Sequence, residues 1–353
     1  MVWIGAGLLA LLLRWGLDPY PMVIETYYSR GFFLGVRLLI DYTIAWLPFP
    51  VLYLVVGGLL WQTGRWVWKW RHRRGNWMEL AATSLTGLLA FAGGAVFLFL
   101  VMWGFNYGRV PVEEQLSLDL QPLTEAELKQ ELFGEAEELR QLRYAIPGAG
   151  TEALDASFLP NDLEAHLRGN LERVLRQHGY QTVGRVRAKI IYPRGIFLRF
   201  SSSGMYFPWT GEGQVDAGLD PLSRVSVMAH ELSHGYGFGD EGTCNFWAYL
   251  ACAASPDPLI AYAGKLDHFR TLAANFLRYD REAYRSFRES LPLGVQADLD
   301  AVNENLRKYP DIMPNLRYAA YDTYLKAQGI PEGMKNYSRV IMMVKAWKEG
   351  IRG

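Results

Sequence analysis

The sequence predicts an α+β fold in which N-terminal transmembrane helices precede a mainly helical domain with a small β-sheet. Long apolar runs fill the first 105 of the 353 residues. Short runs of β-branched and aromatic residues within 185–202 predict strands, because such side chains suit a pleated surface. From residue 221 onward apolar residues recur at helical spacing. We therefore expect a membrane anchor at 1–104 and a second domain at 105–353.

The apolar run at 78–103 is the strongest signal for a membrane span, because about 20 apolar residues cross a bilayer core. A second span is expected within 44–64. The segment 1–13 resembles a short span or the core of a signal peptide, and no small-residue cleavage site follows it. We therefore expect two to three transmembrane helices in the lipid bilayer. Residues 32–43 mix charged and apolar side chains, as in a helix at the membrane interface.

A basic loop at 64–77 separates the second and third expected spans. Its basic residues stand beside tryptophans and are Arg65, Lys69, Arg71, Arg73 and Arg74. Short loops rich in Lys and Arg stay on the cytoplasmic side, and tryptophan favours the membrane boundary. The loop therefore predicts a multi-pass cell-membrane protein whose second domain is extracytoplasmic.

Charge and cysteine content exclude several classes of protein. The 36 basic and 36 acidic residues cancel, so no global field attracts nucleic acid, and none is expected as a partner. Cys244 and Cys252 fall on one predicted helix, about 12 Å apart along its axis, which is too far for a disulfide. We expect neither a disulfide framework nor a cysteine-based zinc site.

Two helices and a small sheet are expected before the most informative motif. In order, the predicted elements are helices at 123–146 and 161–180 and strands at 185–193 and 196–202. The first helix opens with Thr124 and Glu127 in the spacing of a capping box. A proline inside the aromatic run of 204–215 restricts that segment to an edge strand or a loop.

The most informative motif is "HELSH" at 230–234, which has the form HExxH. His230 and His234 share one face of a helix, so they can present two imidazoles to one ion. Glu231 lies beside the first histidine, where it can serve as general base for a zinc-activated water. Pro221 suits the first turn of this helix. The alternative is a helix with two surface histidines.

Two residues compete to supply a third ligand. On a straight helix Glu241 would lie ~10 Å beyond His234, too far for zinc bonds of about 2 Å. The glycines that follow His234 permit the helix to end and the chain to reverse. Asp240 fits the spacing HExxHxxGxxH or its Asp variant, which is typical of metzincins.

Glu241 followed by Asn245 fits the gluzincin pattern instead. There a Glu on the next helix is the ligand, and a polar residue four positions later orients a ligating histidine. Asp240 then has a different role as the N-cap of that helix. We favour Glu241 over Asp240 as the ligand.

Six segments carry a resemblance that runs along nearly the full chain. They are "IETYYSRGFF" (24–33), "LPFP" (47–50), "WGFNYGRVPV" (103–112), "GMYFPWTGEGQV" (204–215), "HELSHGYGFGDEGTCNF" (230–246) and "GIPEGMKNYSRVI" (329–341). In these the chain resembles a bacterial family of membrane-anchored, predicted zinc metallopeptidases of the zincin superfamily, peptidase clan MA. Members of that family have N-terminal spans, an extracytoplasmic domain and a helix of the form HExAHxxGxxxExEANF.

The resemblance implies that Glu241 is the ligand, because it aligns with the first Glu of ExEANF. It is also similar to the ExxxD element of CAAX-prenyl-protease-type membrane zincins, with Asn245 at the Asp position. Ser233, Thr243 and Cys244 depart from the family pattern, which has Ala, Glu and Ala there. None of them is a proposed ligand or base.

Hydrolysis by zincins also needs a donor to the developing oxyanion. Tyr337 and Arg339 are candidates for this catalytic role, mainly because the family match includes their segment. The alternative is a packing tyrosine and a surface arginine at the start of a helix. The aromatic segment 205–209 is either an edge strand that pairs with an extended peptide or ordinary core.

The sequence therefore predicts a membrane-anchored zinc metallopeptidase that hydrolyses peptide bonds in a peptide or protein substrate. His230, His234 and Glu241 would bind Zn²⁺, with Glu231 as general base. The alternative is a catalytically silent zincin-fold envelope protein that acts as a binding or structural module, against which the intact Glu231 counts. Metal-assisted hydrolysis of a non-peptide bond uses the same ligands and stays open.

Overall fold

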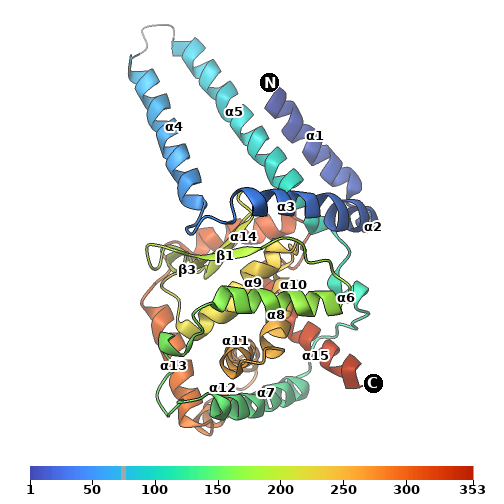
Figure 1. Ribbon diagram of the computed structural model, residues 1–353, viewed down its shortest axis with the longest axis vertical. Helices are drawn as coiled ribbons and strands as arrows, with labels where there is room; N and C mark the ends of the chain where they lie inside the picture. The colour runs from blue at the N-terminus through green and yellow to red at the C-terminus, as the bar shows by residue number, and fades with distance from the viewer. Residues whose placement is uncertain (73–76, 353) are drawn as a thin grey trace. The chain divides into compact units, whose positions relative to one another are not determined.

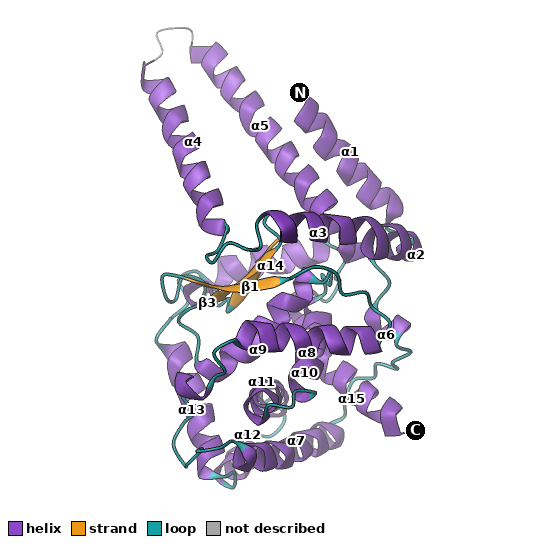
Figure 2. Ribbon diagram, in the orientation of Figure 1, coloured by secondary structure: helices purple, strands orange, loops and turns teal. Residues whose placement is uncertain are grey.

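The computed structural model describes residues 1–72 and 77–352, without the side chains of Tyr337, Ile351 and Arg352. Helices predominate and the strands form one small sheet (Figure 2), which confirms the α+β prediction. The chain divides into two compact units. Unit 1 comprises Met1–Val110, Val183–Arg185 and Phe207–Glu212; unit 2 comprises Pro111–Thr182, Val186–Tyr206 and Gly213–Gly353. The domain boundary expected after residue 104 stays a prediction.

Unit 1 is helical along most of its length (Figure 1). Its elements are α1 (Val2–Leu17), α2 (Pro21–Val23), the π-helix η1 (Ile24–Phe32), α3 (Phe33–Thr43), α4 (Leu52–His72), α5 (Trp77–Met102) and the 3₁₀ helix η2 (Gly104–Gly108). The helices α1 and α5 pack at very close range. A Cβ atom on Gly7 would lie 2.5 Å from the carbonyl oxygen of Gly93, so this approach of two backbones requires glycine.

Among the described residues, α5 is the one helix that is long and apolar enough to cross a membrane unaided. Its 26 residues correspond to the run expected at 78–103. The helix α1 passes the same test only when joined to Pro21–Thr43, from which it is bent by 118°. The multi-pass arrangement and the span within 44–64 stay predictions.

The helix α4 differs from the segment expected in its place. It begins at Leu52, after the prolines of "LPFP", and runs to His72. The described part of the expected basic loop is therefore helical, including Arg65, Lys69 and Arg71, while Arg73 and Arg74 lie outside the described residues. The signals for a short loop were wrong here, because Lys, Arg and Trp are compatible with a helix when no Gly or Pro interrupts them.

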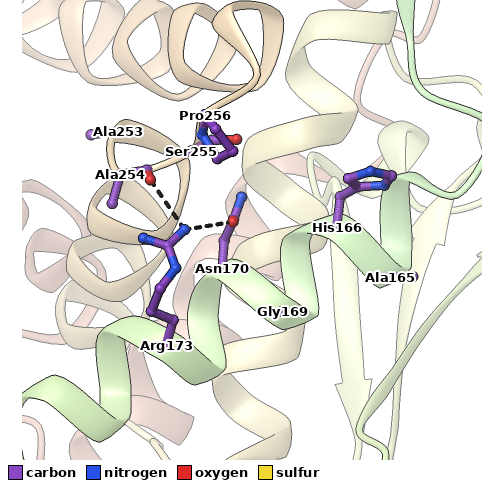
Figure 3. Close-up of a pocket in the computed structure, with 9 residues that line it drawn as sticks. All are labelled: Ala165, His166, Gly169, Asn170, Arg173, Ala253, Ala254, Ser255 and Pro256. Atoms are coloured by element: carbon purple, nitrogen blue, oxygen red, sulfur yellow. Dashed lines mark hydrogen bonds between the residues drawn. The ribbon is translucent and has the colours of Figure 1, made fainter.

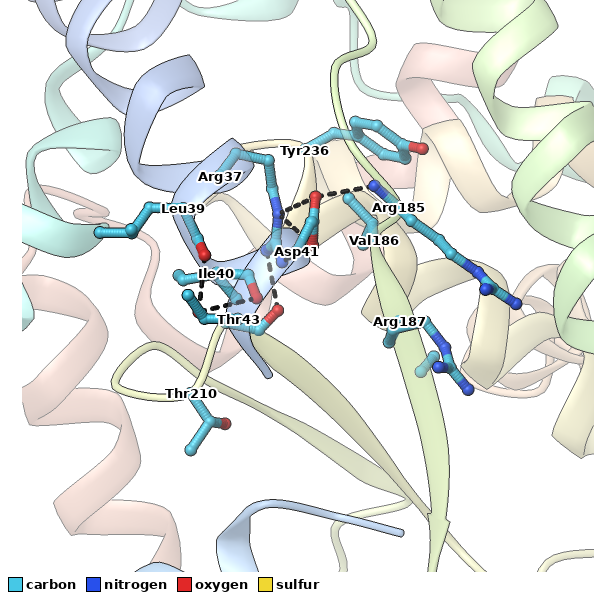
Figure 4. A network of polar contacts seen from close by, with 12 residues as sticks. Arg37, Leu39, Ile40, Asp41, Thr43, Arg185, Val186, Arg187, Thr210 and Tyr236 are labelled. Carbon is cyan, nitrogen blue, oxygen red and sulfur yellow. Dashed lines mark hydrogen bonds and ion pairs between the residues drawn. The ribbon is translucent and has the colours of Figure 1, made fainter. Parts of the chain in front are cut away.

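A buried ion pair explains why two later segments belong to unit 1. Arg37 and Asp41, one turn apart on α3, pair with each other (Figure 4). Asp41 Oδ2 accepts a hydrogen bond of 2.7 Å from the backbone N–H of Arg185, and Arg37 donates one of 2.8 Å to the carbonyl oxygen of Gly211. Buried charges need such partners, and here the partners are supplied by the segments 183–185 and 207–212.

Unit 2 contains the other elements. They are α6 (Val112–Gln115), α7 (Glu125–Ala145), η3 (Ala156–Phe158), α8 (Leu163–Gln177), β1 (Arg187–Ile191), η4 (Leu198–Phe200), α9 (Pro221–Gly235), α10 (Glu241–Ala253), α11 (Pro258–Phe276), α12 (Arg281–Glu289), α13 (Leu293–Arg307), α14 (Pro314–Ala327), η5 (Gly333–Ser338) and α15 (Arg339–Arg352). The capping box of Thr124 and Glu127 is present at the start of α7. The prediction of helices after residue 221 is confirmed.

The sheet has three strands in the order β1-β3-β2, with β2 at Gly204–Phe207 and β3 at Glu212–Asp216. The strand β3 is therefore central and β2 is an edge strand. The segment 204–215 was expected to be an edge strand or a loop. That holds for its first part, which contains β2, but was wrong for 212–215, which belongs to the central strand β3. The expected strand at 196–202 was wrong, since it contains the 3₁₀ helix η4. The buried Asp216 carboxylate accepts from the backbone N–H groups of Gly195 (2.7 Å), Phe197 (2.8 Å) and Leu198 (3.3 Å), which curls the segment.

The helix α10 forms the centre of the hydrophobic core of unit 2. It packs against α8, α9, α11 and α15. Trp247 and Phe246 are fully buried, and Cys244 and Cys252 are buried without a disulfide between them, as expected. A helix that is covered on all sides holds its first turn in a fixed place, and that first turn begins with Glu241.

Candidate metal centre

The helices α9 and α10 are joined by a short turn that contains Gly237. The helix α9 ends at Gly235 and α10 begins at Glu241. Gly237 has φ of +87°, in the left-handed region that glycine adopts without strain. A Cβ atom on Gly235 would lie 2.1 Å from Cγ1 of Val186, so the end of α9 also requires glycine for packing. The turn brings the start of α10 back to the histidines of α9.

His230, His234 and Glu241 meet at this junction. Their ligand atoms all lie within 4.8 Å of one another. The two Nε2 atoms are 3.0 Å apart, and Glu241 Oε2 lies 3.1 Å from Nε2 of His230 and 3.6 Å from Nε2 of His234. His234 and Glu241 are buried, and His230 retains a small exposed surface.

Each of the three side chains is held by a partner on its far side. Nδ1 of His230 donates to Oδ1 of Asn245 at 2.7 Å, and Nδ1 of His234 donates to the carbonyl oxygen of Phe238 at 2.8 Å. With Nδ1 as the donor in each ring, the neutral form of each imidazole presents the lone pair of its Nε2 atom. On the third side chain, Oε1 of Glu241 accepts from the hydroxyl of Tyr321 at 2.8 Å.

This arrangement fits a metal ion with nitrogen and oxygen ligands. Zinc bonds of about 2.0–2.1 Å place neighbouring ligand atoms of a tetrahedral site ~3.3 Å apart. The separations of 3.0, 3.1 and 3.6 Å bracket that value. Ligand atoms at these separations can share one cation when Nε2 of each histidine is unprotonated. The donor set suits zinc among several divalent ions.

The Glu241 carboxyl is electrostatically suited to be an anionic ligand. Burial alone raises its pKa, but the neighbouring His234 and His230 outweigh burial and hold the pKa well below its usual range. Glu241 therefore stays ionised.

Glu231 lies next to this cluster in a space made by two glycines of the sheet. A Cβ atom on Gly204 of β2 would lie 2.5 Å from Oε1 of Glu231, and one on Gly213 of β3 would lie 2.6 Å from its Cβ. Oε2 of Glu231 is buried and has no hydrogen-bond partner among the described residues. Burial raises the pKa of Glu231 to about 8, the charge of His230 opposes the rise, and the Glu241 carboxylate adds to it.

Asp240 lies at the N-cap of α10 and is not one of the three residues whose ligand atoms converge. Its Oδ1 accepts from the backbone N–H of Thr243 at 2.7 Å, which confirms the predicted N-cap. Its Oδ2 accepts from Nδ2 of Asn336 at 2.7 Å, and Oδ1 of Asn336 accepts from the backbone N–H of Gly242, also at 2.7 Å. Asn336 thus holds the first turn of α10 through two hydrogen bonds, one to the side chain of Asp240 and one from the backbone of Gly242.

The structure gives Arg339 contacts that differ from the predicted role. Its guanidinium pairs with Glu113 and lies 3.5 Å from Oδ2 of Asp240, so it stabilises the N-cap of α10. These contacts do not place it against the histidines, and a role as oxyanion donor is not supported by them. The side chain of Tyr337 lies outside the described part of the chain.

Two contacts around the cluster join residues that are far apart in the sequence, so no local pattern predicts them. Tyr321 follows Glu241 by 80 positions and Asn336 follows Gly242 by 94. Asn336 belongs to a segment that carried the family resemblance, and the catalytic roles expected of Tyr337 and Arg339 in that segment stay predictions. Tyr321 lies outside all six segments.

A separate depression of about 600 Å³ lies between α8 and the C-terminal end of α10 (Figure 3). Arg173 there donates to Oδ1 of Asn170 at 2.8 Å and to the carbonyl oxygen of Ala254 at 3.1 Å. Ala254 is the C-cap of α10, whereas Glu241 is its first residue. The length of α10, ~18 Å for 13 residues, separates the depression from the metal-ligand cluster.

A family model described as "Protein of unknown function (DUF3810)" matches residues 28–344. The chain belongs to the DUF3810 family. The match includes the ligand cluster, Glu231, Tyr321 and Asn336. Searches of curated proteins and of solved structures found no match. The DUF3810 description names no activity, so a function has to be argued from the site itself.

Proposed function

We propose that this DUF3810 protein is a membrane-anchored, zinc-dependent peptidase. The observation that carries the proposal is the convergence of His230, His234 and Glu241, each held from behind by its own hydrogen-bond partner. Groups that bind a catalytic metal are commonly oriented in this way. Three protein ligands leave a position for water and substrate, which distinguishes catalytic from structural zinc sites.

Glu231 is the general base in this proposal. A bound Zn²⁺ would lower the pKa of a water molecule and polarise the scissile carbonyl. Glu231 removes the proton from that water and later delivers a proton to the leaving amine. Its buried Oε2, which has no partner among the described residues, is available for this transfer. A cation on the neighbouring ligands favours the ionised form of Glu231 that a base requires.

The substrate is proposed to be an extended peptide that aligns with β2. The strand β2 is at the edge of the sheet, and edge strands bind extended peptides through main-chain hydrogen bonds. The Tyr206 ring on β2 lies 6.0 Å from the His234 ring, centroid to centroid. Gly204 on the same strand lies against Glu231. A peptide added to β2 would therefore pass beside both the base and the ligands.

The membrane topology is part of the proposal. The helix α5 supplies one span, and α1 and α4 are proposed to supply the others. Arg65, Lys69 and Arg71 at the C-terminal end of α4 are proposed to face the cytoplasm, which places unit 2 on the extracytoplasmic side.

Cysteine labelling tests this topology. Thr151→Cys and His72→Cys introduce a thiol at exposed positions, while Cys244 and Cys252 are buried. A membrane-impermeant maleimide should label the first variant in intact cells and the second only after permeabilisation. The reverse pattern would overturn the proposed orientation.

Activity is tested with purified full-length protein and a library of quenched fluorescent peptides. The wild type should cleave members of the library, lose activity with a chelator and regain it with Zn²⁺. Glu231→Gln should retain zinc and lose activity by about 10²–10⁴-fold. Glu304→Gln, at an exposed position on α13, is the matched control and should retain activity. Full activity of Glu231→Gln would refute the mechanism, and a zinc-loaded wild type that cleaves no peptide would favour a silent binding protein.

A further inference from the structure

Glu241 uses its two carboxylate oxygens differently. Oε2 faces Nε2 of both histidines at 3.1 and 3.6 Å. Oε1 accepts the 2.8 Å hydrogen bond from the hydroxyl of Tyr321. Glu241 is buried, so this hydroxyl is a substantial part of the surroundings of Oε1. The two oxygens of this carboxylate therefore have different partners: Oε2 lies beside the histidines, and Oε1 is bound by Tyr321.

The separation matters for the number of ligands that a metal would receive. A carboxylate binds a cation through one oxygen or through both. A catalytic zinc site needs its fourth position for water and substrate, and a second oxygen from Glu241 would compete for it. An O–H donor on Oε1 draws its lone pairs away from the cluster and fixes the rotation of the carboxylate plane.

Tyr321 reaches Glu241 from a helix with little burial of its own. Leu325 is the buried residue on α14, whereas Leu316 and Tyr318 are exposed. The helix packs against η5, where the backbone N–H of Met334 donates to Asp322 at 2.9 Å. The segment η5 in turn carries Asn336, which holds the cap of α10. Together α14 and η5 hold the first turn of α10 at two points.

We propose that Tyr321 is a positioning residue that makes Glu241 bind the metal through one oxygen only. Metal binding then depends on the packing of α14 against the rest of unit 2. This inference rests on the proposed metal site, but not on peptidase activity. The helix α14 lies outside the six segments that carry the family resemblance. In this proposal it influences both the affinity for the metal and the open coordination position.

The test compares Tyr321→Phe with Tyr318→Phe in the full-length protein. Both remove one hydroxyl from α14, and Tyr318 is 48% exposed, so Tyr318→Phe controls for the effect of the substitution on the helix. Zinc affinity is measured by competition with a chromophoric chelator. Coordination number is read from the visible spectrum of the Co²⁺-loaded protein, because four-coordinate Co²⁺ absorbs more strongly than five-coordinate Co²⁺.

Tyr321→Phe should weaken zinc binding by about 10–100-fold. It should also weaken the cobalt band as the second oxygen of Glu241 enters, while Tyr318→Phe should match the wild type in both measurements. An affinity within twofold of wild type together with an unchanged cobalt spectrum would overturn the inference, and so would failure of the wild type to bind cobalt at all. A wild type that binds cobalt but cleaves no peptide would refute the proposed function and leave this inference intact.

Discussion

Nδ1 of His230 and Oδ1 of Asn245 are joined by a hydrogen bond of 2.7 Å across the junction of α9 and α10. The bond fixes the tautomer of His230, so that Nε2 carries the lone pair that faces the cluster. It also joins the two helices that supply the proposed ligands. The orientation of one proposed ligand therefore depends on a side chain of the neighbouring helix.

Replacing Asn245 by Ala should lower zinc affinity by about 10–100-fold, because the His230 ring loses its orienting partner. The fold should survive, since α10 is fixed by its core face and its cap. Asn303→Ala on α13 is the control, because Asn303 is exposed. Chelator competition gives the affinities, and equal affinity in the two variants would show that Asn245 does not orient His230.

Substitutions of the neighbouring residues Glu241 and Asp240 should affect different properties of the protein. Glu241→Ala should abolish zinc binding, because it removes the carboxylate that faces both histidines. Asp240→Ala should retain bound zinc and lower the free energy of unfolding by about 0.5–2 kcal/mol through loss of the N-cap. Zinc content and denaturant unfolding are measured on both proteins. Loss of zinc from the Asp240 variant alone would make Asp240 the ligand.

Substitution of Gly213 should destabilise the protein, because Glu231 packs directly against this glycine. A Cβ atom there would lie 2.6 Å from Cβ of Glu231, so Gly213→Ala should displace the base and destabilise unit 2 by about 1–3 kcal/mol. Gly134→Ala should instead raise the free energy of unfolding, by roughly 0.5–1 kcal/mol. Gly134 lies within α7, and nothing lies within 4 Å of a Cβ atom built there. Peptidase activity should fall only in the first variant. Normal activity and stability of Gly213→Ala would contradict the packing described for Glu231.

Asp298 tests the core of unit 2 independently of any metal. Its carboxylate accepts from Nε of Arg143 (2.8 Å), the backbone N–H of Leu154 (2.7 Å) and the hydroxyl of Tyr262 (2.6 Å). Asp298→Asn leaves a buried arginine without its anion and should lower the free energy of unfolding by about 3–5 kcal/mol.

Asp300→Asn is the matched control for that prediction. Asp300 pairs with Arg288 at 2.7 Å, but its side chain is 68% exposed, so its loss should change stability by at most about 1 kcal/mol. Urea unfolding followed by tryptophan fluorescence measures both variants. Similar losses in the two would mean that the Arg143–Asp298 pair is not buried in the folded protein.

The parts of the fold and site that were predictable depend on local chemistry. Thr124 and Glu127 are three residues apart and cap α7 as predicted. His230 and His234, like Glu241 and Asn245, are one helical turn apart, so their shared faces follow from spacing alone. The turn between the helices followed from glycine, and Asp240 was recognisable as an N-cap.

What was missed depends on contacts between distant residues. The expected strand at 196–202 is curled by Asp216, whose preference for those N–H groups has no pattern in the sequence. Tyr321 reaches Glu241 from 80 residues away, and α14 otherwise reads as an ordinary helix. The pairing of Arg339 with Glu113 and Asp240 likewise joins residues that are about 100 or more positions apart.

The most direct test of the account is the metal content of the purified full-length protein after incubation with Zn²⁺ and removal of the excess. Elemental analysis should give about one zinc per chain for the wild type and for Glu231→Gln, as expected of a site with three protein ligands. It should give close to none for His230→Ala, His234→Ala and Glu241→Ala. A wild type without zinc, or variants of all three residues that retain it, would contradict the assignment of this cluster as a metal centre.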